Sequence, residues 1–319
     1  MDLMSPGMDP MEVTRADVEW AYDRIRARVR RTPVVTLEPG AFDVPGHLVL
    51  KLELLQHTGS FKPRGAFNRM LAAEVGDAGV IAASGGNFGL GVAHAAHALG
   101  HPAEIFVPET AQPVKVQAIR ELGAEVHVVP GFYADALLAC EDRVLETGAL
   151  YLHAYDQPEV AAGGGTVGLE LSDERFMIDT VLVAVGGGGL IGGIAAWFGG
   201  EARVIGVEPV QCPTLNAALA AGTPVDVEVG GIAADSLGAK RIGRIGFEVA
   251  RRFVERVVLV TDDDIAEAQR RLWHDCRVAA EPGGAAALAA LISGAFVPEP
   301  DERVVVLVCG GNTDPGSVA

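Results

Sequence analysis

Short apolar runs alternate with helix-like segments along most of the chain, and this alternation constrains the fold more than any other feature. Eight runs are predicted to be strands, at 80–84, 103–108, 124–130, 149–155, 180–185, 203–209, 256–261 and 303–309. Helical stretches separate them, for example 88–99, 113–122, 190–198 and 264–279. Strands that alternate with helices are typical of βαβ units around a mostly parallel sheet. The sequence therefore predicts an α/β fold.

The 319 residues suffice for one large domain or for two lobes with separate cores. No long linker, repeat or low-complexity tract divides the chain. We expect two lobes, each with a mostly parallel sheet flanked by helices. The large lobe is predicted to be discontinuous, formed by residues 1–76 and 154–319, and to embrace a small lobe at 77–153.

Two predicted helices start with a capping-box pair, in which a threonine and an aspartate lie three residues apart. Thr14 with Asp17 predicts a helix near the N-terminus, and Thr261 with Asp264 predicts another after the last-but-one strand. The stretch before them, residues 1–11, lacks a basic region followed by an apolar one. It is expected to be a frayed tail rather than a signal peptide.

The charge and the cysteines exclude several classes of function. A formal net charge of −17 argues against nucleic acid, whose phosphates demand a basic surface. Apolar runs such as "TVLVAV" and "VVVLVC" are far shorter than a membrane span. The four cysteines are scattered without a C-x-x-C pair, so a disulfide framework or zinc knuckle is not expected. We expect a cytoplasmic protein with neither a nucleic-acid nor a membrane partner.

The most prominent glycine cluster is "AVGGGGLIGG", which follows a predicted strand and opens a predicted helix. Backbone N–H groups without side chains, together with a helix N-terminus, make an anion site suited to phosphate. Gly187, Gly189 and Gly192 also give the dinucleotide pattern G-x-G-x-x-G, with Glu208 as the possible ribose-binding acid. An NAD(P)-dependent dehydrogenase is therefore an alternative, as is a glycine turn that serves only packing.

Two further loops follow predicted strands, at the edge where open α/β sheets bind ligands. "ASGGNFG" offers the Ser84 hydroxyl, the Asn87 amide and bare backbone donors that could hold a carboxylate, although it could also be an ordinary capped turn. "VCGGNTD" places Cys309 at a strand tip, where the thiol is either a small hydrophobe or a neutral partner for a heteroaromatic nitrogen. "EPGGAAALAA" adds Glu281 at a helix start, which the helix dipole alone could explain.

The stretch "QHTGSFKPRGAFN" holds a single lysine, Lys62, between a glycine turn, an aromatic ring and a proline. The side chain is either a solvated loop lysine or a nucleophile with a fixed position and a lowered pKa. His94, His97 and His101 have ligand-like spacing, but no carboxylate or cysteine completes a metal set.

Taken together, these loops resemble the fold-type II family of pyridoxal 5′-phosphate (PLP) enzymes, closest to the threonine/serine dehydratases and similar to serine racemases. The resemblance runs from "RRTPVV" to "CGGNTDP" and includes "SFKPRGA", "ASGGNFG" and "GGGGLIGG" in the family's order and spacing. It implies PLP as the cofactor and an amino acid as the substrate. Because the chain ends soon after Cys309, no regulatory domain that confers feedback by isoleucine is expected.

The resemblance also implies a role for each matching residue. Lys62 would carry the cofactor and act as the catalytic base, and the other cofactor-binding residues would be Phe61, Asn87, Gly186, Gly187, Gly188, Gly189 and Cys309. Ser84, Gly86 and Asn87 would receive the substrate carboxylate. The implied reaction is the dehydration of L-threonine or L-serine, or both, to a 2-oxo acid and ammonia by a homodimer.

The chain departs from the family at several positions. Phe88 replaces the histidine of the usual S-x-G-N-H loop, and Ser236 stands where relatives commonly have glycine. Serine racemases carry a serine at the place of Gly85, so racemisation lacks its second proton donor here. A racemase or a β-replacement synthase nevertheless remains an alternative on the same fold.

The family's divalent-cation site is not expected in this chain. Related racemases and some dehydratases bind the cation through an acid, a carbonyl four residues on and an aspartate two further. Glu208, Cys212 and Thr214 occupy these places, and Thr214 supplies no charge. Only Glu208 remains as a candidate ligand for a hard cation.

Overall fold

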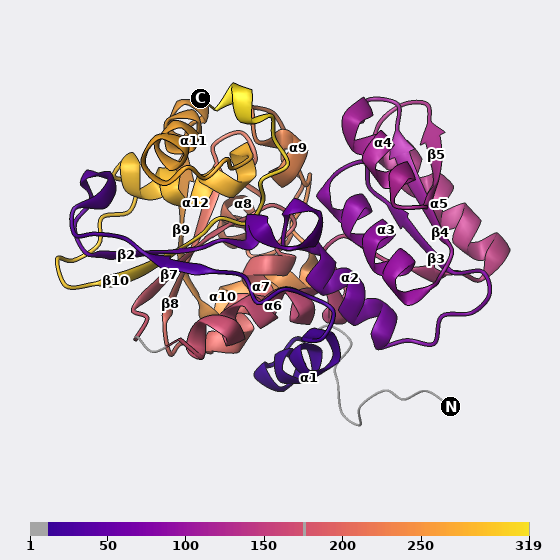
Figure 1. Cartoon of the computed structure of the whole chain (residues 1–319), viewed down its shortest axis with the longest axis horizontal. Coiled ribbons are helices and arrows are strands. Elements are labelled where there is room, and N and C mark those ends of the chain that lie inside the picture. The colour runs from indigo at the N-terminus through magenta and orange to yellow at the C-terminus, as the bar shows by residue number, and fades with distance from the viewer. Residues whose placement is uncertain (1–11, 175–176, 319) are drawn as a thin grey trace.

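The computed structural model describes residues 12–174 and 177–318, so the tail predicted over 1–11 lies outside the described residues. Within these residues the strands form two sheets, one of six strands and one of four. Figure 1 shows the larger sheet and its helices on the left, and the smaller sheet and its helices on the right. The predicted α/β fold with two mostly parallel sheets flanked by helices is confirmed.

The six-stranded sheet has the order β1-β2-β10-β7-β8-β9. Its strands are β1 (Val34–Thr36), β2 (His47–Lys51), β7 (Thr180–Ala184), β8 (Arg203–Pro209), β9 (Val254–Val260) and β10 (Arg303–Leu307). Only the edge strand β1 pairs antiparallel; the other neighbours are parallel.

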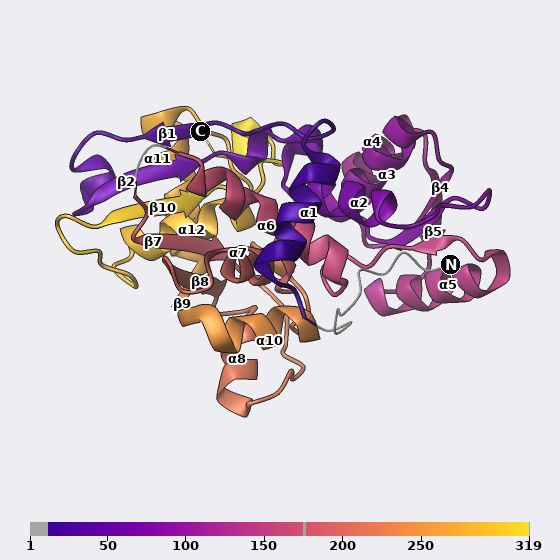
Figure 2. The same cartoon turned by 90° about the horizontal axis from the view of Figure 1, so that it is seen from below.

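Helices cover both faces of this sheet, as Figures 1 and 2 show. One face carries α1 (Arg15–Ile25), α6 (Pro158–Ser172), α7 (Gly189–Phe198) and α10 (Arg244–Phe253). The other carries α11 (Asp262–Cys276) and α12 (Pro282–Ile292), while the short α8 (Thr214–Ala221) and α9 (Ala234–Leu237) lie in the connection after β8.

The four-stranded sheet is wholly parallel, with the order β5-β4-β3-β6. Its strands are β3 (Val80–Ala83), β4 (Ala103–Pro108), β5 (Glu125–Val129) and β6 (Leu150–Tyr151). The helices around it are α2 (Lys62–Leu71), α3 (Asn87–Leu99), α4 (Pro113–Glu121) and α5 (Tyr133–Thr147). All four strands fall inside the range 77–153 proposed for the small lobe, and the exact boundary stays a prediction.

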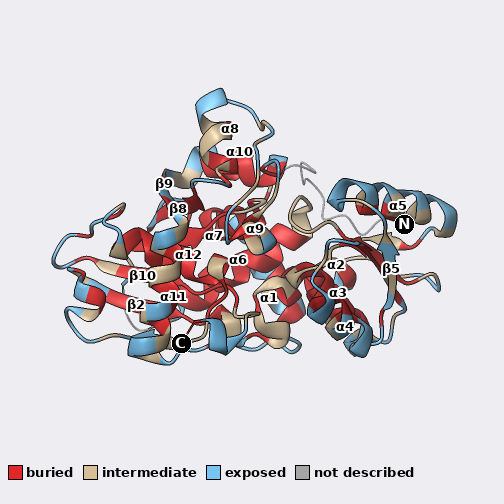
Figure 3. Ribbon diagram, turned by 90° about the horizontal axis from the view of Figure 1, so that it is seen from above, coloured by how far each residue is buried: buried red, intermediate tan, exposed pale blue. Residues whose placement is uncertain are grey.

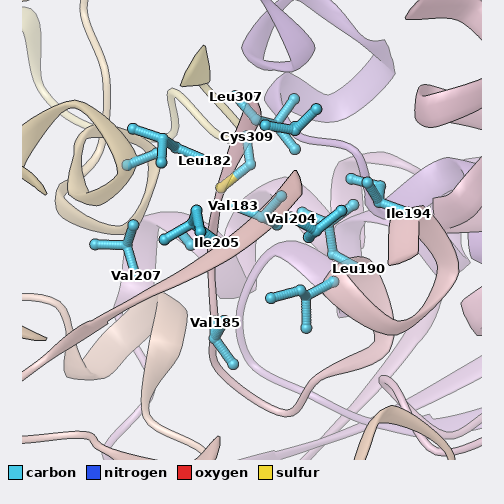
Figure 4. Close-up of a cluster of buried hydrophobic side chains, with 14 of the residues drawn as sticks. Leu182, Val183, Val185, Leu190, Ile194, Val204, Ile205, Val207, Leu307 and Cys309 are labelled. Carbon is cyan, nitrogen blue, oxygen red and sulfur yellow. The ribbon is translucent and has the colours of Figure 1, made fainter. Parts of the chain in front are cut away.

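The central strands are apolar throughout because both of their faces are buried. Leu182 and Val183 of β7 are fully buried, as are Ile205 and Val207 of β8. Figure 4 shows these side chains packed with Leu190 and Ile194 of α7, and Figure 3 shows the buried core beneath exposed outer helices. A sheet covered on both sides in this way leaves its strand ends, not its faces, available for a site.

Every predicted strand occurs, but their lengths and number differ from expectation. The strand expected at 149–155 has only the two residues of β6, because the chain turns at residues 153–157 toward the other sheet. β1 and β2 were not predicted. Both predicted capping boxes are present at α1 and α11. None of the helices in the described ranges is long and apolar enough to cross a membrane.

Three helices meet so closely that only glycine fits between them. A Cβ on Gly193 of α7 would lie 2.1 Å from the carbonyl oxygen of Ala161 on α6. A Cβ on Gly163 of α6 would lie 2.6 Å from the carbonyl oxygen of Arg64 on α2. Backbone therefore packs against backbone, which holds α2 rigidly against α6.

Four fully buried charged side chains connect helix α2 to helix α6 and to the large sheet. Arg64 pairs with Glu53 at 2.7 Å and with Glu170 of α6 at 2.8 Å. Glu170 also pairs with Lys51 at the end of β2, at 2.7 Å. The Lys51 Nζ in addition donates to the Thr32 carbonyl oxygen at 2.9 Å. Two cations and two anions balance one another, which is the condition under which buried charges are tolerated.

Replacing Glu170 with glutamine should leave Lys51 and Arg64 short of one anion and destabilise the fold by about 3–5 kcal/mol. Urea unfolding measures the change in the free energy of unfolding. The matched control is Glu201→Gln, which removes an exposed pair with Arg15 and should cost less than about 1 kcal/mol. Equal losses in the two variants would contradict the structural role of the buried network.

Candidate active site

One cavity collects the loops that the sequence singled out. It encloses about 480 Å³ of empty space, part of it open to solvent, at the carboxyl ends of strands β7 and β10. Its lining residues come from the starts of helices and from strand ends: Phe61, Lys62, Asn87, Tyr155, Ala184, Gly186, Gly187, Gly188, Gly189, Leu190, Ile191, Ser236, Leu237, Glu281 and Cys309. Segments from residue 61 to residue 309 thus converge on a single site.

Lys62 is the first residue of α2, and its amine has one hydrogen-bond partner and two aromatic neighbours. The Nζ donates to the Ala154 carbonyl oxygen at 3.0 Å. It lies 5.0 Å from the ring centroid of Phe61 and 5.5 Å from that of Phe88. Burial lowers the pKa of Lys62 to about 8, while Cys309 and Glu281 act in the opposite direction. The amine is therefore far easier to deprotonate than an exposed lysine.

Two backbone hydrogen bonds connect the loop before Lys62 to the segment that follows β10. The Phe61 N–H donates to the Cys309 carbonyl oxygen at 3.2 Å, and the Gly311 N–H donates to the Gly59 carbonyl oxygen at 2.9 Å. Gly59 has a φ of +74°, and a Cβ there would lie 2.4 Å from Oδ1 of Asn312. A glycine is therefore required where the two segments cross.

The glycine loop between β7 and α7 presents free backbone donors. No acceptor in the described part of the chain takes the N–H groups of Gly186, Gly187, Gly188 or Gly189. A Cβ on Gly187 would lie 2.2 Å from the ring of Tyr155, and Gly188 has a φ of +89°. Free N–H groups at a helix N-terminus attract anions, phosphate above all. The arrangement favours the phosphate-binding interpretation over a turn that serves only packing.

Asn87 and Glu281 form a polar pair in the wall of the cavity. The Asn87 Nδ2 donates to Oε1 of Glu281 at 2.5 Å, and its Oδ1 accepts from Nδ2 of Asn312 at 2.8 Å. Among the described residues, no group pairs with the buried Oε2 of Glu281. Burial raises the pKa of Glu281 to about 7, against the attraction of Lys115. This carboxyl group can therefore be neutral near physiological pH.

Cys309 and the loop at residues 84–86 complete the set of predicted residues. Burial raises the pKa of Cys309 to about 12, so its side chain is a neutral thiol. Ser84 and Gly86 share a loop with Asn87 but do not line the cavity. The Gly86 N–H donates to Ser84 Oγ at 3.3 Å, and a Cβ on Gly86 would lie 3.7 Å from the Asp235 carbonyl oxygen. Helix α9 therefore lies over this loop.

Glu208 has a structural role at the start of α8. Its Oε1 accepts the N–H of Leu215 at 2.7 Å and its Oε2 accepts the N–H of Asn216 at 2.9 Å. The Thr214 hydroxyl also donates to Oε1 at 3.0 Å. The fully buried carboxyl group thus caps the start of α8, and these bonds account for its position without a ribose or a cation. Across the described ranges, no group of three or more His, Cys, Asp or Glu side chains could hold a metal.

Three residues near the cavity were not given a role from the sequence. Tyr155 was assigned to the strand at 149–155, yet it lies in the turn after β6 and covers the glycine loop. Asn312 lies in the loop "VCGGNTD" and orients Asn87. His153 lies beside Tyr155, with ring centroids 4.6 Å apart. An aromatic residue just past a strand end is a sequence signal for a residue near the cavity. The contacts of that aromatic side chain, however, depend on segments far away in the sequence.

The cavity residues fit a phosphate-bearing cofactor that attaches to an amine. The glycine loop offers unclaimed N–H donors and a surface that any Cβ would fill. Lys62 offers an amine with a lowered pKa in the same cavity. The neutral thiol of Cys309 and the amide of Asn87 complete the set of polar groups in the cavity. PLP meets each of these requirements, because it carries a phosphate, an aldehyde and a pyridine ring.

Comparison with known proteins agrees with this fit. The model of the family described as "Pyridoxal-phosphate dependent enzyme" matches residues 25–310. An L-threonine ammonia-lyase of Thermotoga maritima is 36% identical over 307 residues, which cover 95% of this chain and 76% of that protein. A catabolic L-threonine dehydratase of Staphylococcus aureus is 37% identical over 310 residues, covering 95% and 90%.

Solved structures give the same assignment. The structure of maize serine racemase matches with a TM-score of 0.90 and 32% identity, covering 96% of this chain and 95% of that one. A threonine deaminase of the organism abbreviated T.th. matches with a TM-score of 0.88 and 34% identity, covering 94% and 99%. The family match extends over far more than half of the sequence and includes every loop of the cavity. The chain belongs to the family of pyridoxal-phosphate dependent enzymes.

Proposed function

We propose that this protein is a PLP-dependent ammonia-lyase that dehydrates L-threonine, L-serine or both to a 2-oxo acid and ammonia. The observation that carries the proposal is the position of Lys62, whose pKa is lowered to about 8, in one cavity with the free N–H groups of the glycine loop. Relatives named L-threonine ammonia-lyase and L-threonine dehydratase support this choice within the family.

Each cavity residue would bind a different part of the cofactor. Lys62 would bind it covalently, and the N–H groups at residues 186–189 would hold its phosphate. Cys309 would face the ring nitrogen as a neutral thiol, Asn87 would bond the ring hydroxyl, and Phe61 would pack beside the ring. When bound, PLP supplies an electron sink for the charge that develops at the substrate Cα.

Lys62 is proposed as the base that takes the Cα proton of the substrate. A pKa of about 8 leaves a useful fraction of free amine at neutral pH, which an exposed lysine does not offer. The Phe61 and Phe88 rings lie beside the amine, with ring centroids 5.0 Å and 5.5 Å from its nitrogen. Loss of the β-hydroxyl as water leaves an enamine, and its hydrolysis takes up water and releases ammonia and the 2-oxo acid.

The substrate carboxylate is proposed to bind at the loop formed by Ser84, Gly86 and Asn87. This loop leads into the N-terminus of α3, whose dipole favours an anion. Asn312 holds the Asn87 side chain in a fixed orientation through its 2.8 Å hydrogen bond. A carboxylate at this loop would lie next to the cavity that contains Lys62, because Asn87 belongs to both.

Racemisation is the second candidate, since maize serine racemase has a similar structure. It requires a proton donor on the face of the cofactor opposite the base, where serine racemases have a serine. Gly85 has no side chain, and a Cβ there would lie 2.6 Å from the Cβ of Ala111. The structure thus has neither the hydroxyl nor the space for it, which favours elimination.

We further propose that the protein acts in the cytoplasm as a homodimer. The four cysteines are free thiols, and Cys140, Cys212 and Cys309 are buried. Unpaired cysteines fit a reducing compartment. The homodimer follows from the family resemblance, and sedimentation of the purified holoenzyme would establish its subunit number.

The first prediction concerns Lys62 and the substrate. Incubation of the holoenzyme with L-threonine, L-serine, D-serine and 3-hydroxyaspartate should release 2-oxo acid and ammonia from L-threonine or L-serine. Lys62→Ala should abolish both turnover and the visible absorption band of lysine-bound cofactor. Lys240→Ala is the matched control, because Lys240 is exposed and away from the cavity. An active Lys62→Ala enzyme would refute the assignment.

A covalent readout separates cofactor attachment from turnover. The chain has four lysines, Lys51, Lys62, Lys115 and Lys240. Borohydride reduction followed by peptide mapping should find the cofactor on Lys62, since Lys51 and Lys115 are engaged in ion pairs. Label on any other lysine would overturn the proposed site even if the enzyme were active.

Gly187→Ala should weaken PLP binding, because the new Cβ would collide with Tyr155 and deform the phosphate loop. We expect the affinity of the apoenzyme to fall about ten- to a hundred-fold, measured by fluorescence titration with PLP. Gly76→Ala is the control, since no atom lies within 4 Å of its added Cβ. Unchanged affinity in Gly187→Ala would argue against a phosphate at this loop.

Gly85 provides a test of elimination against racemisation. The wild-type enzyme should convert L-serine to 2-oxo acid without forming D-serine, as measured by chiral chromatography. The double variant Gly85→Ser with Ala111→Gly supplies a hydroxyl and the space it needs, and D-serine should then appear. D-serine from the wild-type enzyme at a rate comparable to that of the 2-oxo acid would favour the racemase.

A further inference from the structure

The chain crosses from the small sheet to the large sheet through residues 153–157, which we call the crossover strap. Three of its members contact separate parts of the site. The Ala154 carbonyl oxygen accepts the Lys62 amine at 3.0 Å. The Tyr155 ring covers Gly187, and Asp156 Oδ1 accepts the N–H of Ile245 at the start of α10 at 3.0 Å. The strap therefore touches both the lysine and the glycine loop.

His153 organises the strap through its ring and its backbone. Its Nδ1 accepts the N–H of Asp156 at 2.9 Å and lies 3.3 Å from the N–H of Tyr155, the weaker of the two bonds. Its own N–H donates to Oε1 of Gln157 at 2.9 Å. The Tyr155 ring packs edge-on against the imidazole, at 82°. One side chain thus holds the two residues that follow Ala154.

These bonds require a neutral imidazole. Two N–H groups point at Nδ1, so that nitrogen must carry a lone pair and the ring proton must lie on Nε2. An imidazolium bears a proton on both nitrogens and cannot accept either bond. Burial lowers the pKa of His153 and Lys62 lowers it further, whereas Asp156 raises it. The other facing groups are the rings of Tyr151 and Tyr155.

We propose that His153 is a positioning residue, which as a neutral hydrogen-bond acceptor holds the crossover strap against Lys62 and over the glycine loop. The inference rests on the proposed function only in taking those two features as the cofactor site. Protonation of His153 removes both bonds, so the Ala154 carbonyl and the Tyr155 ring lose their support. The affinity for PLP should consequently fall as the pH falls through the pKa of His153.

The test uses His153→Asn and His153→Phe in the full chain. The asparagine Oδ1 can accept N–H groups two and three residues ahead, as in an Asx turn, and it does not titrate between pH 5 and 8. Phenylalanine keeps a ring of similar size but accepts no hydrogen bond. His274→Asn is the control, because His274 is exposed and its side chain pairs with no described residue other than Asp275.

The affinity of each apoenzyme for PLP is titrated from pH 5 to pH 8 by fluorescence, with the melting temperature recorded in parallel. Wild type and His274→Asn should lose affinity toward acid, whereas His153→Asn should lose markedly less. His153→Phe should bind about ten-fold more weakly than wild type at pH 8, where wild-type His153 is neutral. The ionisation of PLP itself is common to all variants, so the difference between curves isolates His153.

Two results would overturn the proposal. One is a loss of PLP affinity toward acid pH in His153→Asn that equals the loss in wild type. The other is a folded His153→Phe variant that binds PLP as tightly as wild type. If His153→Phe does not fold, the comparison of His153→Asn with wild type decides alone. A holoenzyme that carries PLP on Lys62 but turns over no amino acid would refute the proposed lyase and leave this test intact.

Discussion

The buried charges of Lys51, Glu53, Arg64 and Glu170 determine where Lys62 lies. Arg64 is two residues beyond Lys62 on α2, and its guanidinium bonds two carboxylates that come from different elements. Because a buried cation without partners is very costly, α2 cannot rotate or slide without breaking this balance. Lys62 therefore projects from a rigid helix rather than from a mobile loop, as a preorganised reactive group requires.

The electrostatics of the cavity follow from helix starts rather than from charged side chains. Helices α2, α3, α7 and α12 all begin at its wall. Each contributes partial positive charge, which favours a phosphate or a carboxylate and disfavours an ammonium group. Cys309 is neutral, and a pKa of about 7 keeps a substantial part of Glu281 protonated at pH 7. A chain with a net charge of −17 thus builds a local environment suited to an anionic cofactor and a free amine.

The sequence predicted those parts of the structure that depend on local pattern. Apolar runs located the buried strands, and glycine clusters after strands located the loops that meet in the cavity. The sequence did not predict β2, because this strand ends in Lys51. The burial of Lys51 depends on Glu170, which lies 119 residues away. Glu208 fitted two motifs by spacing, but its oxygens cap α8. Partners distant in the sequence decided each of these cases, and no local pattern encodes them.

The crossover strap has a mechanical consequence. Among the described residues, two connections of the chain join the two sheets, one from β2 to β3 and one from β6 to α6. On another side of the site, Lys115 of α4 forms an ion pair with Asp235 of α9. A rotation of one sheet against the other that breaks this pair would also move the strap, because the strap connects the two sheets. Because the Ala154 carbonyl oxygen accepts a hydrogen bond from the Lys62 amine, such a rotation would also shift the position of that amine.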